Sequence, residues 1–233
     1  MKRIIFVLLL VAALAQPAMA GTIKSLATMG PYAAGSGGEF TLLVVEGFGL
    51  NGYNDPLTKN VLQQGTFQTF CLELHEYMYT NTTFNAVKNT NAVKGGVLDP
   101  AGDPLSLGTG WLYSQFAAGT LDGYFVDPQF ATRKAAAAAL QNTIWWLEEE
   151  GVANPGNYFS NLVSAKFLNP RATDIGSTYG VYALNLTQGQ ARPVDRQDVL
   201  YYDPQTVPDG GTTLMLLGGA LMGLGALSRK FRR

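Results

Sequence analysis

The chain is poor in the residues that build disulfides, metal sites and charged surfaces. Its 233 residues include one cysteine and one histidine, and 14% of them are charged. One cysteine cannot form an internal disulfide, and one cysteine with one histidine falls short of the ligand set of an ordinary zinc site. We therefore expect no internal disulfide, no metal site and no cofactor.

The low net charge hides an asymmetry between the two ends and the middle of the chain. The sequence has 16 basic and 17 acidic residues. Six of the basic residues lie in the terminal segments: Lys2, Arg3, Arg229, Lys230, Arg232 and Arg233. Without them the middle of the chain carries ten basic and 17 acidic residues, a formal charge of about −7. An acidic domain argues against a nucleic-acid partner, whose binding depends on neutralising phosphates.

The first 20 residues have the layout of a secretory signal peptide. A basic start is followed by an apolar run over residues 4–15 and by Ala18-Met19-Ala20, a small-residue cleavage site. The apolar run is too short to span a bilayer. We expect cleavage after Ala20 and export of the mature chain.

The C-terminal end has the layout of a membrane segment with a basic tail. Residues 212–228 are uncharged and rich in leucine, glycine, alanine and methionine, and Arg229 opens a basic cluster. This length is at the lower limit for a transmembrane helix, and the basic cluster fits the cytoplasmic side. We therefore divide the chain into a signal peptide (1–20), an extracellular β-rich domain with a helical insert (21–205) and a C-terminal segment (206–233).

Hydrophobic periodicity within residues 21–205 predicts an α+β fold. Strands are expected at 40–46, 66–77, 179–186 and 198–202, helices at 104–118, 127–150 and 158–167, and a hairpin or loop at 81–103. The elements do not alternate as βαβα, which favours a mainly antiparallel β core with a helical insertion. With the N-terminal signal and a C-terminal transmembrane helix, this is the expected architecture.

Three local patterns could carry chemistry, and each has a simpler interpretation. Residues 47–52 match G-x-G-x-x-G, but no helix follows to hold a pyrophosphate, so we interpret them as a turn. His75 would lie about 13 Å from Cys71 along a strand, too far to act as its base. The run Glu148 to Glu150 could supply paired carboxylates for glycoside hydrolysis, but such a run is more typical of a solvated helix end.

Cys71 and Gln141 form the pair that we weigh most closely. The cysteine lies on the expected strand at 66–77, and the glutamine lies on the apolar face of the helix at 127–150. A cysteine that attacks a glutamine carboxamide releases ammonia and leaves an internal thioester, provided that the two groups are in contact and water is excluded. The alternative is a core cysteine and a hydrogen-bonded core glutamine, and the spacing alone favours this alternative.

The C-terminal segment resembles a PEP-CTERM-type sorting signal, closest to the VPDSG variant. Val207-Pro208-Asp209 is followed by two glycines, an apolar glycine-rich stretch and the basic tail. The resemblance implies processing by an exosortase-like enzyme, transient anchoring in the inner membrane and association with exopolysaccharide at the cell surface.

The core resembles the Cys–Gln thioester domains of bacterial surface adhesins. Phe70-Cys71 matches the aromatic-Cys strand of that family, and Gln141, Ile144 and Trp145 match its later glutamine segment. The resemblance implies a thioester between Cys71 and Gln141, covered by Phe70, Ile144 and Trp145. It also implies covalent capture of an amine or hydroxyl on an exopolysaccharide or surface-protein partner.

We therefore expect a secreted or cell-surface protein that is not an enzyme. In the leading interpretation it attaches covalently to a surface partner through the thioester. In the alternative it is a passive exopolysaccharide-associated structural or carbohydrate-binding protein without a thioester.

Overall fold

A computed structural model describes residues 20–35, 37–47, 65–93, 102–189 and 193–203, which form an α+β fold. The strands are β1 (Ala20–Ser25), β2 (Ala33–Ala34), β3 (Gly37–Gly38), β4 (Phe40–Gly47), β5 (Thr66–Thr69), β6 (Thr83–Asn89), β7 (Asn91–Ala92), β8 (Asp103–Pro104), β9 (Val181–Gln188) and β10 (Val194–Tyr202). The helices are α1 (Leu107–Ala117), α2 (Arg133–Leu147) and α3 (Tyr158–Lys166). The predicted fold class is confirmed, and the helices follow one another between β8 and β9.

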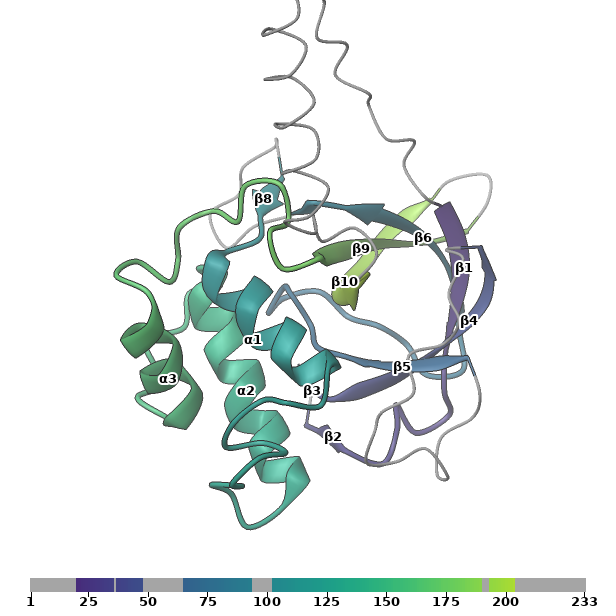
Figure 1. Cartoon of the computed structure of the whole chain (residues 1–233). Coiled ribbons are helices and arrows are strands. Elements are labelled where there is room, and N and C mark those ends of the chain that lie inside the picture. Colours follow the sequence, from purple (N-terminus) through teal and green to yellow (C-terminus); the bar gives the residue numbers. More distant parts are fainter. Residues whose placement is uncertain (1–19, 36, 48–64, 94–101, 190–192, 204–233) are drawn as a thin grey trace, which may run out of the picture.

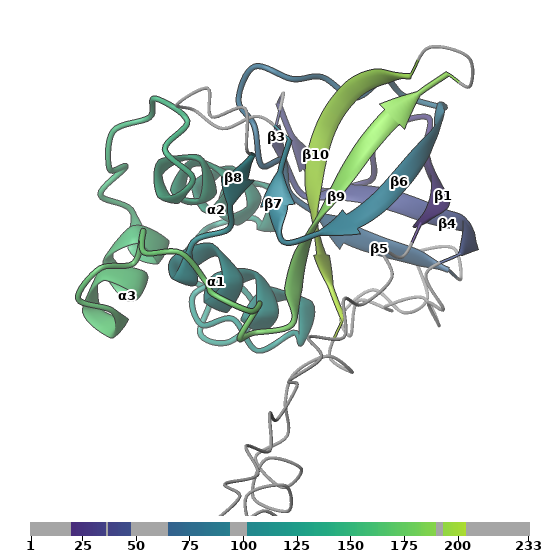
Figure 2. The ribbon, with the colours of Figure 1, turned by 90° about the horizontal axis from the view of Figure 1, so that it is seen from above.

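Six strands form one antiparallel sheet in the order β10-β9-β6-β1-β4-β5. The sheet curls so that its two edges approach each other, as seen from above in Figure 2. The edges meet at Cys71, which forms a bridge with Val199 of β10, while the Leu200 N–H donates to the Phe70 carbonyl. Residues just after β5 therefore lie against β10, although more than 120 residues separate them in sequence.

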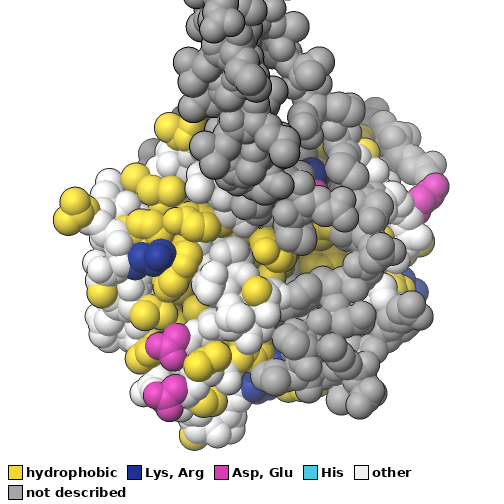
Figure 3. All heavy atoms as spheres, in the orientation of Figure 1, with side chains coloured by type: hydrophobic (Ala, Val, Ile, Leu, Met, Phe, Trp, Pro, Cys, Tyr) yellow, Lys and Arg dark blue, Asp and Glu magenta, His cyan; other side chains and the backbone are white. Residues whose placement is uncertain are grey.

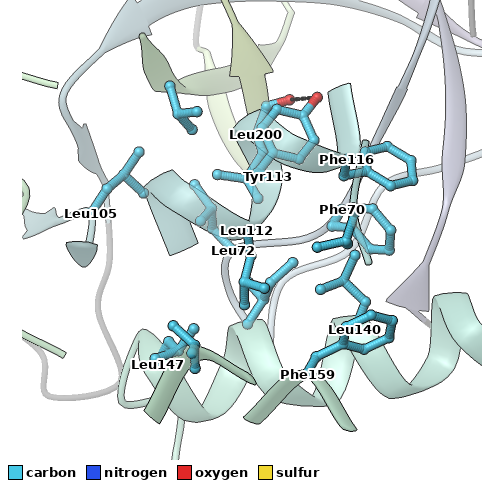
Figure 4. Close-up of a cluster of buried hydrophobic side chains, with 14 of the residues drawn as sticks. Phe70, Leu72, Leu105, Leu112, Tyr113, Phe116, Leu140, Leu147, Phe159 and Leu200 are labelled. Carbon is cyan, nitrogen blue, oxygen red and sulfur yellow. Dashed lines mark hydrogen bonds between the residues drawn. The ribbon is translucent and has the colours of Figure 1, made fainter. Parts of the chain in front are cut away.

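Two hydrophobic cores fill the molecule. One lies within the curled sheet and includes Ile23, Leu42, Phe67 and Phe84. The larger one packs the three helices against the sheet, and Figure 4 shows its labelled side chains converging between α1, α2 and α3. Because polar groups at the boundary between the cores are far from water, they must find partners inside the protein.

Three local predictions were wrong in their details. The strand expected at 66–77 ends at Thr69, because the Leu72 N–H donates to the Asp198 carbonyl and the chain turns away from β4. The hairpin or loop expected at 81–103 contains β6, which pairs with both β1 and β9. Strand β1 was not predicted, and it begins at Ala20.

The long helix begins later than predicted. The sequence predicted a start at residue 127, but Asp127 has φ +43°, which is not a helical conformation. The helix begins at Arg133, and the Thr132 hydroxyl accepts a hydrogen bond from the Ala135 N–H at 3.1 Å. A threonine hydroxyl at this position satisfies one of the free N–H groups of the first turn.

Within the described residues, no helix is long and apolar enough to cross a membrane. Residues 1–19 of the expected signal peptide (1–20) and the expected transmembrane segment at 212–228 lie outside them, as do most residues of the G-x-G-x-x-G turn.

Candidate functional site

Cys71 lies where the chain leaves β5 and reaches β10. Only 1% of its surface is exposed. Burial, followed by the charge of Glu73, raises the pKa of the Cys71 thiol far above its usual range. At neutral pH the buried side chain is therefore a protonated thiol and not a thiolate.

Gln141, in the middle of α2, reaches the backbone of Cys71. Its Nε2 donates to the Cys71 carbonyl at 2.8 Å, and its Oε1 accepts from the Cys71 N–H at 2.9 Å. The carboxamide thus pairs with the main chain of Cys71 much as a neighbouring strand would. The structure brings together the two residues that the sequence analysis paired, and Gln141 is 1% exposed.

A second N–H group completes the environment of the Gln141 oxygen. The Gly38 N–H, from β3, donates to Oε1 at 3.0 Å. Oε1 therefore accepts from two backbone donors that come from separate segments. Two N–H groups on one carbonyl oxygen withdraw electron density from the carbon, which is the arrangement of an oxyanion hole.

Gly37 allows β3 to lie close to Gln141 and Trp145 of α2, because it has no side chain. A Cβ built there would lie 2.7 Å from the Gln141 Cγ and 2.6 Å from the Cη2 of Trp145. Both distances are too short for any side chain larger than hydrogen. The indole of Trp145 and the stem of Gln141 thus both pack directly on the backbone of β3.

Glu39 fixes β3 against the start of α2. It is fully buried, and its carboxylate accepts from Arg133 Nε at 2.9 Å, from Arg133 Nη2 at 2.6 Å and from the Tyr124 hydroxyl at 2.6 Å. A bidentate arginine–carboxylate pair has a defined geometry. Because Arg133 and Gln141 belong to the same helix, the salt bridge holds Gly38 in register with Gln141.

The other expected cover residues lie at different places. The Phe70 ring packs edge-on against Phe116 at 4.9 Å between ring centroids, in the helical core. Ile144 is fully buried in the same core. Of the three residues, Trp145 is the one that packs on Gly37 beside Gln141.

A pocket of about 180 Å³ opens beside Cys71. Its apolar and aromatic walls come from Met29, Phe40, Tyr77 and Met78, and Glu76 and Gln197 add polar groups. These residues belong to separate stretches of the chain, so no sequence motif marks the pocket. Gly38, Glu39 and Glu76 were all missed by the sequence analysis, and only the glycine pair at 37–38 could have drawn attention to this segment.

The three consecutive glutamates do not face one another across a cleft. Glu148 is buried and accepts from the N–H and hydroxyl of Ser106, at 3.2 and 2.7 Å. Glu150 accepts from the Leu74 N–H at 2.8 Å, while Glu149 is half-exposed and pairs with Arg171. Glu148 and Glu150 thus accept hydrogen bonds from backbone donors of neighbouring segments, whereas Glu149 forms an ion pair at the surface.

Burial raises the pKa of Glu148 to about 7, although the hydrogen bonds from Ser106 oppose the shift. The Glu148 carboxyl therefore titrates near neutral pH. Its hydrogen-bond donors belong to Ser106, which caps the first turn of α1, and it does not line an open cleft.

One group of carboxylates has the composition of a cation site. Ligand atoms of Glu73, Glu76 and Asp198 lie within 4.8 Å of one another. The Asp198 carboxylate already accepts from the Asn185 side chain at 2.6 Å and from the Val93 N–H at 2.7 Å. Burial raises the pKa of Asp198 to about 7. These bonds give Asp198 a structural role.

His75, the only histidine, is exposed. It does not take part in any of the hydrogen bonds described around Cys71.

Comparison with known proteins identifies the C-terminal segment. Residues 206–231 match the VPDSG-CTERM motif, and the match includes Val207, Pro208 and Asp209. No curated protein and no solved structure matches the chain. The matched segment is consistent with processing by an exosortase-like enzyme. The chain is therefore an exported protein, secreted or at the cell surface, that carries a C-terminal sorting signal of the VPDSG-CTERM type.

Proposed function

We propose that this protein is a non-enzymatic surface protein that attaches covalently to a partner through a thioester between Cys71 and Gln141. The observation that supports it is the placement of the Gln141 carboxamide. Its oxygen accepts from the N–H groups of Cys71 and Gly38, and its nitrogen donates to the Cys71 carbonyl. The bonds go to the main chain of Cys71, and they hold the carboxamide beside the residue that carries the thiol.

Thioester formation balances without any added reagent. The Cys71 sulfur adds to Cδ of Gln141, and the negative charge that develops on Oε1 is stabilised by the N–H groups of Cys71 and Gly38. The C–N bond then breaks, and the amide nitrogen leaves as ammonia with the proton of the thiol. The products are one thioester and one ammonia.

Burial protects the proposed thioester from hydrolysis. Cys71 and Gln141 are each 1% exposed, so that water reaches the bond poorly. The same burial raises the pKa of the Cys71 thiol, which makes its thiolate a poor leaving group. The bond therefore persists until a nucleophile on the partner is held against it, and attack at the Gln141 carbonyl then transfers the acyl group and frees Cys71.

The sorting signal supplies the location for this reaction. In the proposed route, the signal peptide is cleaved after Ala20, the segment at 212–228 anchors the chain transiently in the inner membrane, and an exosortase-like enzyme processes it near Val207-Pro208-Asp209. The released domain (21–205) then meets exopolysaccharide or surface proteins, which carry hydroxyl and amine nucleophiles.

The decisive experiment is the intact mass of the exported protein, before and after incubation with methylamine. A mass that is short by one ammonia, and an adduct at Gln141 with a newly alkylatable Cys71, are the expected results. Cys71→Ala and Gln141→Ala should each abolish the ammonia deficit and the methylamine adduct. Asn142→Ala, which changes the exposed neighbouring amide, is the matched control and should keep both. A full mass that methylamine leaves unchanged would refute the thioester.

A second candidate is a passive carbohydrate-binding protein, and an aromatic surface favours it. Figure 3 shows hydrophobic side chains gathered over the side of the molecule that carries the helices. Half-buried Phe167 contacts Trp111 at 6.1 Å and Tyr179 at 6.4 Å between ring centroids, and Leu168 beside it is fully exposed. Clustered rings that remain partly exposed offer flat apolar surface to a ligand.

Binding of purified exopolysaccharide tests this second candidate. Trp111→Ala should weaken binding, whereas Cys71→Ala should not. The opposite pattern would favour covalent attachment as the function.

A further inference from the structure

The segment between α3 and β9 carries the two most exposed large hydrophobic side chains of the described residues. Leu168 is fully exposed, and Ile175 is 85% exposed. Figure 1 shows this projecting segment, residues 167–180, in green, where it crosses from α3 to β9. A single exposed aliphatic side chain is common in soluble proteins, but an apolar patch on one segment marks a surface for a protein or a membrane.

Partly exposed aromatic rings border the projecting segment. Phe167 lies between Trp111 and Tyr179, and all three are half-buried. Tryptophan and tyrosine combine an apolar body with a polar tip, and they are enriched where a membrane meets water. These rings also suit a sugar ring, but two projecting aliphatic side chains fit the acyl chains of a lipid better than the hydroxyl groups of a glycan.

The charges of this region suit anionic lipid headgroups, although the exported domain as a whole is acidic. Lys166, the last residue of α3, is exposed, and none of the ion pairs among the described residues involves it. Arg171 pairs with Glu149, and Asp174, the only acid of the projecting segment, is buried. The exposed face of the segment therefore presents apolar and basic groups, and basic groups near a membrane are attracted to anionic lipids.

The end of the described domain adjoins the projecting segment. The Asp203 N–H donates to the Gly180 carbonyl at 2.8 Å. Eight residues, 204–211, separate Asp203 from the expected membrane segment at 212–228. Even a fully extended chain of this length spans no more than about 30 Å. While the chain is anchored, the membrane is therefore held close to Gly180, and such a tether raises the effective concentration of the lipid surface.

We infer that the projecting segment is a lipid-binding surface. While the C-terminal segment anchors the chain, Leu168 and Ile175 enter the boundary of the acyl chains, and Lys166 lies at the level of the headgroups. This inference is independent of Cys71 and Gln141, but it rests on the anchoring step of the proposed route. A contact of two side chains is weak and reversible without a second anchor, so removal of the sorting signal also releases the domain from the lipid.

The experiment reports the surroundings of one side chain at a time in the full chain, reconstituted into vesicles of phosphatidylethanolamine and phosphatidylglycerol. Cys71 is 1% exposed, so the parent chain should take up little thiol-reactive label and is the blank. A nitrobenzoxadiazole label on Ile175→Cys should brighten severalfold, shift to shorter wavelength and be quenched by lipids that carry doxyl groups on their acyl chains. The same label on Val194→Cys should show no change, because Val194 is also exposed but begins β10, far from its end at Tyr202.

A second substitution in the labelled Ile175→Cys chain tests the apolar contribution. Leu168→Asn should remove most of the brightening, because it replaces the most exposed apolar side chain by a polar one without adding charge. Asn169→Ser, at the exposed neighbour, is the matched control and should keep the brightening. Both substitutions are at the surface, so neither should disturb the fold.

The outcomes separate the lipid-binding surface from the anchor. A chain that floats with the vesicles but leaves the label at residue 175 unchanged overturns the lipid-binding surface alone. A chain that does not float with them overturns the anchor and the surface together. A label that responds to rising protein concentration without vesicles assigns the surface to a second copy of the chain, and one that responds to polysaccharide but not to lipid assigns it to a glycan. Either of these two results also overturns the inference.

Discussion

Gln141, within helix α2, and Glu148, the residue that follows its last turn, are buried polar side chains that accept hydrogen bonds from other segments. Gln141 accepts from the N–H groups of Cys71 and Gly38, and Glu148 accepts from the N–H and hydroxyl of Ser106. Both are less than 5% exposed. They perform the same structural task, because each completes the hydrogen bonding of a backbone segment that has left regular structure.

The difference between them lies in their chemistry. Gln141 is an amide that does not titrate, and its hydrogen bonds go to the main chain of Cys71. Glu148 is an acid whose pKa burial raises to about 7. Gln141 therefore contributes to stability independently of pH and is the residue of the proposed thioester, whereas Glu148 makes stability depend on pH. Variants at the two positions can separate these properties.

The largest effect is expected from Gln141→Leu. The substitution preserves bulk but leaves the N–H groups of Cys71 and Gly38 buried without their acceptor. Each unsatisfied buried donor costs about 1–3 kcal/mol, so unfolding in urea should show a loss of about 3–5 kcal/mol. The oxygen is still present in a thioester, so this cost is expected whether or not the bond forms.

Asn142→Leu is the control for this prediction. Asn142 is the next residue of α2 but is exposed. Its substitution should change the free energy of unfolding by no more than about 0.5 kcal/mol. If the two variants unfold at the same urea concentration, the hydrogen bonds to Gln141 do not stabilise the fold.

The pairing of Cys71 with Gln141 was predictable only in part. The sequence placed Gln141 on the apolar face of a helix, and a family resemblance paired it with Cys71. The second donor on Oε1 was not predictable, because it is the backbone N–H of Gly38, and a backbone group leaves no signature in the residue type. The contact also depends on the Glu39–Arg133 salt bridge, which spans 94 residues.

The fold was predictable where one face of an element is apolar throughout. The helices at 107–117 and 158–166 and the strand at 40–47 lie close to their expected positions. Strand β6 was missed because the polar composition of residues 81–103 outweighed the short alternation of buried Phe84 and Ala86 with exposed neighbours. The curl of the sheet, which brings Cys71 to Val199, depends on tertiary packing and has no local sequence signal.

The second effect concerns pH and Glu148. A carboxyl whose pKa is higher in the folded chain than the usual 4.5 binds its proton more tightly when folded. Its contribution to stability is therefore complete below a pH of about 4.5 and is lost as pH rises through about 7. At about 1.4 kcal/mol per pKa unit, this group accounts for roughly 3 kcal/mol over that range.

Glu148→Gln should remove this part of the pH dependence, because glutamine keeps an acceptor for Ser106 but does not titrate. The free energy of unfolding, measured between pH 4.5 and 8, should then fall less steeply than in the parent. Some slope should remain, since burial also raises the pKa of Asp198 to about 7. Glu149→Gln, at the half-exposed neighbour, should keep the parent profile, and an unchanged profile in Glu148→Gln would contradict the prediction.

The smallest change in stability, but the most selective one, is expected from Gly37→Ala. The new Cβ would lie 2.7 Å from the Gln141 Cγ and 2.6 Å from the Trp145 ring, so both must move. Overpacking of this kind costs about 1–3 kcal/mol. Because the displaced atoms belong to Gln141, the fraction of chains with the ammonia deficit should fall more than stability does.

Gly35→Ala separates packing at Gln141 from general damage to this segment. Gly35 has φ +66°, and a Cβ there meets nothing within 4 Å. Its replacement should cost about 1–2 kcal/mol of backbone strain without moving Gln141. The ammonia deficit should therefore stay at the parent level in Gly35→Ala and drop in Gly37→Ala. Equal deficits in the two variants would mean that close packing of β3 on Gln141 is not needed for the bond, and that the two N–H donors alone are enough to position it.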